Sequence, residues 1–129
     1  MSVYRTTIEA QVATSVVSQT QSFPAGGAAL AVETISSSAT EVYAVVVDNS
    51  LNTEACYLKG FDTTGGVVEG VDKPHLILKA DAGTKVQYSF DNGVSLTSGL
   101  KAMVTTTAVT AGVTAPASDV QIFYLVTVT

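Results

Sequence analysis

Residues 85–90 read KVQYSF, and this stretch decides the fold class because its apolar and polar side chains alternate without interruption. A period of two places successive side chains on opposite faces of a β-strand. Val86, Tyr88 and Phe90 are therefore predicted to face a core, and the polar residues between them to face outward.

Turn-forming sequences bound this strand on both sides, DAG at residues 81–83 and DNG at residues 91–93. Further strands are predicted over residues 42–47, 55–61, 75–80, 100–107 and 120–128. Six strands thus follow residue 40, separated by turns, and no helical period of useful length interrupts them. This arrangement predicts an all-β chain that forms an antiparallel β-sandwich or a jelly-roll-like fold.

The same alternation predicts the inward faces of the last two strands. Their expected core positions are Leu100, Ala102, Val104, Ile122, Tyr124 and Val126. The other face of the last strand still carries Phe123 and Leu125, so this strand is either central in its sheet or covered by another chain. Residues 42–47 are continuously apolar, which predicts a strand buried on both faces. Residues 55–61 are expected to pair with it, with a possible bulge at Gly60.

The first 40 residues differ from the rest, because they carry only three charges, those of Arg5, Glu9 and Glu33. Two interpretations stay open for residues 1–40. They are additional strands of the domain, or an extended N-terminal arm that pairs with a neighbouring subunit, since a long uncharged edge strand invites partners. The remaining residues, 41–129, are predicted to form the β-sandwich domain.

Two β-capable runs lie within this segment, over residues 7–17 and 29–35. A break of sequence FPAGG at residues 23–27 separates them.

Composition excludes several classes of function. The net charge is −5 and no Lys/Arg cluster exists, so direct nucleic-acid binding is not expected. No apolar run reaches the length of a membrane span, and the N-terminus lacks a signal-peptide pattern. The single cysteine, Cys56, cannot form an intramolecular disulfide, which fits assembly in a reducing cytosol. Cys56 is interpreted as a small buried apolar residue.

No residue is predicted to be catalytic, cofactor-binding or metal-binding, and an enzyme is not expected. His75 has no second histidine or nucleophile near it in sequence. Six aspartates fall in turns or at strand ends, where they bond nearby backbone: Asp48, Asp62, Asp72, Asp81, Asp91 and Asp119. A calcium site in these loops is an alternative that no ligand spacing supports. Five tyrosines could form a sugar-stacking platform: Tyr4, Tyr43, Tyr57, Tyr88 and Tyr124. All but Tyr4 lie in predicted strands, where core packing is the more frequent use of a tyrosine.

Residues 56–62, CYLKGFD, and residues 93–107, GVSLTSGLKAMVTTT, together with the closing strand over 120–128, resemble small β-sandwich proteins of tailed bacteriophages. The resemblance covers about residues 42–129. This chain departs from the pattern in its loop after Asp62, which holds a Gly-Gly pair, and the first 40 residues have no counterpart.

The resemblance implies a virion structural protein without chemistry. The expected function is that of a capsid cement or decoration protein that stabilises the head through oligomeric contacts. Its expected partners are other copies of itself, with a trimer suggested by analogy, and virion proteins such as the major capsid protein. The alternatives are a tail, neck or baseplate component and, in another class, a carbohydrate-binding or adhesive module. The absence of tryptophan argues against the last of these.

Overall fold

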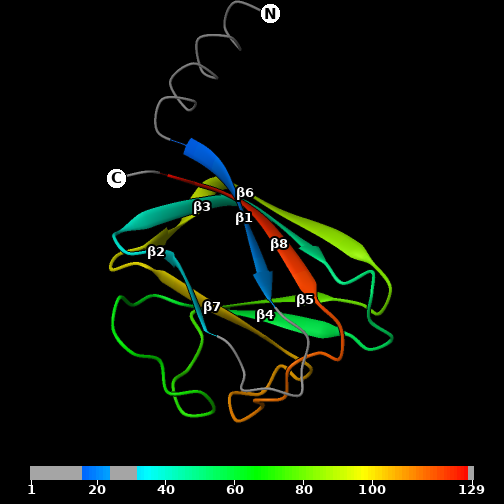
Figure 1. Cartoon of the computed structure of the whole chain (residues 1–129). Helices are drawn as coiled ribbons and strands as arrows, with labels where there is room; N and C mark the ends of the chain where they lie inside the picture. The colour runs from blue at the N-terminus through cyan, green and yellow to red at the C-terminus, as the bar shows by residue number, and fades with distance from the viewer. Residues whose placement is uncertain (1–15, 24–31, 128–129) are drawn as a thin grey trace, which may run out of the picture.

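The computed structural model describes residues 16–23 and 32–127, which form two four-stranded antiparallel sheets packed face to face (Figure 1). The strands are β1 (Val16–Phe23), β2 (Glu33–Ser36), β3 (Thr40–Asp48), β4 (Cys56–Phe61), β5 (Leu76–Ala80), β6 (Lys85–Leu96), β7 (Leu100–Thr105) and β8 (Val120–Thr127). These ranges contain no helix, and hence no helix able to span a membrane. The prediction of an all-β sandwich is confirmed.

The strand order identifies the sandwich as a jelly roll. Sheet A has the order β1-β8-β3-β6 and sheet B the order β2-β7-β4-β5, with every pairing antiparallel. Along the chain, each strand is followed by one in the opposite sheet, except that β4 is followed by β5. Two four-stranded sheets exchanging strands in this way form the eight-stranded jelly roll.

The core lies between the sheets and is built from their inward faces. Its buried members come from six of the strands, β3 to β8, and are Val42, Val45, Val47, Cys56, Leu58, Leu78, Ala80, Leu96, Leu100, Ala102, Val104, Val120, Ile122, Tyr124 and Val126. The six positions predicted on β7 and β8 are all among them. Val86, Tyr88 and Phe90 of β6 also pack against this core but stay half-buried, because β6 is the edge strand of sheet A.

Residues 91–93 were predicted as a turn between two strands, and this is wrong. They lie inside β6, opposite the point where the pairing of β3 shifts between Val42 and Ala44. Gly93 adopts a φ of 77°, and a Cβ atom placed there would lie 3.1 Å from the ring of Tyr43. Glycine therefore lets the chain bulge without ending its pairing with β3.

Three expectations for β3 and β4 also need correction. β3 is central in sheet A, but only its inner face is fully buried, and Ala44 and Val46 on the outer face are half-buried. β4 lies in sheet B and does not pair with β3. Gly60 is not a bulge, because it pairs with Leu76 and Ala102 without a register shift.

The N-terminal strands β1 and β2 join different sheets. β1 pairs with β8 along its whole length, and β2 pairs with β7. Most of the run predicted over residues 7–17 lies outside the described residues. β8 thus lies between β1 and β3 and is central in sheet A. The apolar residues Phe123 and Leu125 on its outer face left two alternatives, a central strand or a strand covered by another chain. The structure shows the first.

Candidate interaction surfaces

His75 and Cys56 lie apart, and within residues 16–23 and 32–127 no three His, Cys, Asp or Glu side chains converge as metal ligands would. His75 is exposed just before β5, and its backbone N–H donates to the Gly60 carbonyl over 2.7 Å. Cys56 is fully buried on the inner face of β4, and burial raises the pKa of its thiol to about 11. Cys56 is therefore a protonated core side chain at neutral pH.

The carboxylates of Asp48 and Asp62 accept hydrogen bonds from backbone N–H groups, and the partners of Asp62 lie far away in the sequence. Asp48 accepts a hydrogen bond from the N–H of Ser50, two residues away, and bonding to Ser50 lowers its pKa. Asp62, at the end of β4, instead accepts bonds from the turn between β6 and β7, including the N–H groups of Thr97 and Ser98 at 3.0 and 2.9 Å. These bonds, that from Ser98 foremost, lower the pKa of Asp62. The sequence predicts only local bonds for Asp62, because its partners lie more than 30 residues away.

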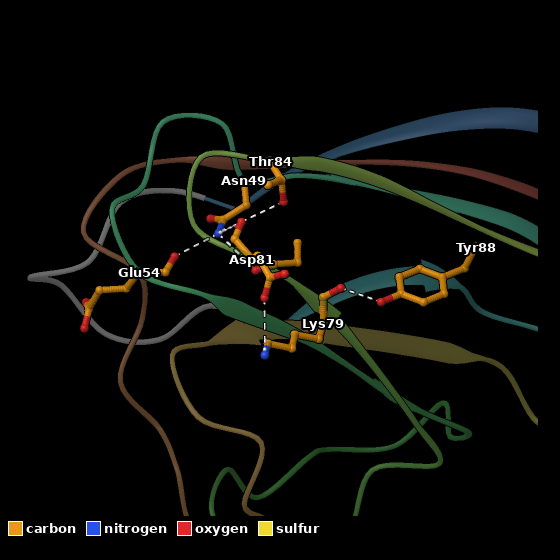
Figure 2. A network of polar contacts seen from close by, with 7 residues as sticks. Asn49, Glu54, Lys79, Asp81, Thr84 and Tyr88 are labelled. Atoms are coloured by element: carbon orange, nitrogen blue, oxygen red, sulfur yellow. Dashed lines mark hydrogen bonds and ion pairs between the residues drawn. The ribbon is translucent and has the colours of Figure 1, made fainter.

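The four strand tyrosines do not form one platform. Tyr124 is buried in the core, while Tyr43, Tyr57 and Tyr88 are half-buried on three different strands. Tyr88 packs against the core, and its hydroxyl donates to the Lys79 carbonyl of β5, which joins an edge of sheet A to an edge of sheet B (Figure 2). The expectation of core packing thus holds fully for Tyr124 alone.

Two long loops, residues 62–75 between β4 and β5 and residues 106–119 between β7 and β8, extend from sheet B on the side away from sheet A (Figure 1). They touch each other, since a Cβ atom placed on Gly70 would lie 3.2 Å from Val113 Cγ1. Phe61 and Met103 are buried, yet neither belongs to the cluster between the sheets. The loops therefore cover a second, smaller core on the outer face of sheet B.

Lys59 of β4 is fully buried in this second core, with an exposed fraction of 0%. Its ammonium donates to the carbonyl oxygens of Val109 at 2.7 Å and of Gly112 at 3.0 Å, both in the β7–β8 loop. Its acceptors are thus neutral backbone groups rather than a carboxylate. Burial lowers the pKa of Lys59. A buried cation needs such partners, so Lys59 ties the loop down onto the sheet.

The lowered pKa of Lys59 gives a testable dependence of stability on pH. Between the pKa in the folded chain and the usual value of 10.5, the unfolded chain binds more protons than the folded one. Stability due to Lys59 therefore rises with pH through this window. We expect the difference in unfolding free energy between the wild type and Lys59→Met, measured by denaturant titration, to shift in favour of the wild type as pH rises towards 10.5. A difference that stays flat would contradict the buried position of this ammonium.

Exposed apolar side chains gather on the same loops. Six large hydrophobic side chains are exposed among the described residues, and five of them lie on the sheet B side: Val68, Val71, Ile77, Val109 and Val113. Ile77 belongs here because it is the cross-strand partner of Lys59 and shares its outward face. We call these five residues the apolar loop surface. Five exposed hydrophobic side chains on one side of the molecule differ from single, scattered ones, which are normal on protein surfaces.

The outer face of sheet A is a second, less exposed apolar region. Val46, Phe123 and Leu125 are half-buried there, on β3 and β8. The ammonium of Lys85 lies 5.4 Å from the centre of the Phe123 ring, which is a cation–π distance. This contact partly covers the ring, so this face offers less apolar area than the loops.

A buried polar junction closes one end of the sandwich (Figure 2). Asn49, after β3, donates from its side-chain amide to the carbonyls of Glu54, Ala80 and Asp81 at 2.9–3.2 Å. Asn52 donates in turn to the Asn49 side-chain oxygen over 2.8 Å. The junction therefore joins the β3–β4 loop of sheet A to the end of β5 in sheet B. It satisfies buried groups and is a structural element rather than a reactive one.

Two hollows in the described part of the molecule lie between the sheets and where their edges meet. A cavity of about 20 Å³ between the sheets is lined only by apolar residues and Gly60, and it is too small for an organic ligand. An open hollow of about 350 Å³ lies where β5 meets β6, next to Lys79, Lys85 and Tyr88. Its polar side chains include an exposed Lys79–Asp81 ion pair at 3.2 Å (Figure 2).

No protein-family model matches the chain, and no curated protein matches it significantly. Several solved structures are similar in arrangement. A chain in the capsid of Helicobacter pylori bacteriophage KHP30 is 13% identical over 88% of both chains, with a TM-score of 0.46. The PRD1 vertex protein P5 is 11% identical over 90% of this chain and 98% of that chain, also with a TM-score of 0.46.

A protein of the Bacillus endospore appendages, which are disulfide-linked pili, is 12% identical over 89% of this chain and 90% of that chain, with a TM-score of 0.43. All three TM-scores lie below 0.5. The function proposed below therefore does not rest on these proteins.

Proposed function

We propose that this chain is a non-enzymatic virion structural protein, most specifically a capsid cement or decoration protein that acts as a homo-oligomer on the major capsid protein. The observation that supports this best is the apolar loop surface, with five exposed hydrophobic side chains on one side of a jelly roll. Eight-stranded jelly rolls recur as building blocks of viral capsids, although lectins and cupins also use them.

The chemistry of the described residues favours binding over catalysis. No three of their His, Cys, Asp and Glu side chains converge as metal ligands would, and the carboxylates of Asp48, Asp62 and Asp72 accept bonds from backbone N–H groups. Exposed apolar clusters of this kind mark protein–protein contact sites on small domains. A partner that covers the valines would gain apolar burial at roughly 25 cal/mol per Å², which offsets the entropy lost on association.

A tail, neck or baseplate component would use the same surface and differs only in its place in the particle. A carbohydrate-binding or adhesive module is the alternative of another class. The hollow beside Tyr88 favours it, since lectins share the jelly roll. Against it, the Tyr88 hydroxyl already donates to a backbone carbonyl and its ring is half-buried.

The location of the protein in the parent particle tests this proposal. We expect a cryo-electron-microscopy map of the particle to place copies of this jelly roll over the junctions between capsomers. Copies found only in the tail would support the neck, tail or baseplate alternative. Particles that contain no copy by mass spectrometry would overturn the proposal, and binding to a glycan array would then favour the adhesive module.

A further inference from the structure

We propose that the apolar loop surface is a self-association surface, on which a second copy of this chain binds about a two-fold axis. This inference rests on the proposed function, which requires contacts between copies, and it identifies the surface that makes them. Three features of the molecule support it: the rigidity of the β7–β8 loop, the shape of the β4–β5 loop and the charges beside the valines.

The β7–β8 loop is held in place before any partner arrives. Lys59 donates to the carbonyls of Val109 and Gly112, and the N–H of Thr106 donates to the Thr114 carbonyl over 2.9 Å. Gly112 approaches so closely that a Cβ atom there would lie 1.8 Å from the hydroxyl oxygen of Thr107. A loop fixed in this way displays Val109 at little further cost in conformational entropy.

The β4–β5 loop is fixed against it. The N–H of Val68 donates to the Asp72 carboxylate over 2.9 Å, and the N–H of Asp72 donates back to the Val68 carbonyl over 3.0 Å. Between them Gly70 adopts a φ of 80°, which lets the chain turn against Val113. Val68 and Val71 are exposed at 56% and 69%, so this compact turn presents both to solvent.

The charges beside the valines favour a second copy as the partner. Glu69, Asp72 and Lys73 are all exposed within one short stretch of the β4–β5 loop. A two-fold interface brings the same patch together from both subunits, so it must be complementary to itself. A patch that carries both signs meets this condition, because Lys73 of one copy can face Glu69 of the other. A partner whose charges all had the same sign would attract only some of these three side chains and repel the others.

The test is the oligomeric state of the full-length chain in sedimentation experiments at micromolar concentration. We expect the wild type to form a dimer and the double variant Val71→Asp/Val109→Asp to weaken self-association at least about tenfold, since it places like charges in the contact. Leu51→Asp is the matched control, because Leu51 is as exposed as Val71, at 69%, but lies on the β3–β4 loop. It should leave the dimer unchanged. Circular dichroism confirms that each variant is folded.

A charge swap tests whether the partner is a second copy. Lys73→Glu alone should weaken the dimer, and Glu69→Lys/Lys73→Glu should restore it, because a self-complementary patch stays complementary when both signs are exchanged. A monomeric wild type would overturn the proposal, as would a double variant with the wild-type mass, a swap without rescue, or a trimer. A monomeric wild type would also contradict the homo-oligomeric part of the proposed function. None of these results bears on the location of the protein in particles, so the proposed virion role is tested separately.

Discussion

Tyr124→Ala is expected to lower the free energy of unfolding by about 3–5 kcal/mol, the range for removing a buried aromatic ring. Tyr124 lies on β8, between β1 and β3 in sheet A, and is only 5% exposed. Its side chain borders the cavity of about 20 Å³ between the sheets. Removing the ring would enlarge this cavity. Because paired strands flank β8 on both sides, the backbone cannot easily move in to fill the space.

Urea denaturation monitored by circular dichroism measures this loss. Phe90→Ala provides the comparison, since Phe90 is aromatic and packs against the same core but is half-buried on the edge strand β6. Its cost should be below about 3 kcal/mol, because part of the ring is already in water. If Tyr124→Ala costs no more than Phe90→Ala, the placement of Tyr124 at the centre of the core is wrong.

Asn49→Ala is expected to cost about 2–4 kcal/mol, although Asn49 contributes no apolar burial. Its side-chain amide donates to three carbonyls, and one of these bonds, to Ala80, is buried. Its side-chain oxygen also accepts the bond from Asn52. Alanine would remove all of these bonds in a site where water has little access, and bonds lost by buried polar groups are expensive. The Asp81 carbonyl would still accept from Thr84, and the Asn52 amide would still donate to Ser118.

Two further variants make the test specific. Asn49→Asp keeps the size of the side chain but replaces its N–H donors with an acceptor, so it should destabilise at least as much as Asn49→Ala. Asn92→Ala changes an exposed asparagine of β6 and should cost less than about 0.5 kcal/mol. Chemical denaturation of the three variants would contradict the junction in Figure 2 if Asn49→Ala behaved like Asn92→Ala.

The sequence predicted much of the sandwich correctly because the period of two is a local property. Alternation alone identified the inward faces of β7 and β8, and the turn residues placed most strand ends. The prediction from turn residues was wrong at residues 91–93, where an Asp-Asn-Gly sequence suits both a turn and a bulge. Only the pairing of β6 with β3 on both sides of the bulge selects between these outcomes.

The apolar loop surface could not be predicted from the sequence. Val68, Val71 and Val109 resemble any other valine of a β-rich chain, and nothing local shows that two loops on the same side of sheet B expose them (Figure 1). Lys59 is a charged residue, and nothing in the sequence around it indicates that it is buried. It is buried because the β7–β8 loop, some 50 residues later, covers it.

The sequence by itself determined that this protein is built from β-strands with predictable inner faces, because side-chain alternation and turn chemistry act over a few residues. Only the tertiary structure decided the jelly-roll strand order, the cover over Lys59, the Asn49 junction and the apolar loop surface. Each of these joins segments far apart in the chain, and such pairings depend on the closure of long loops and on packing between sheets.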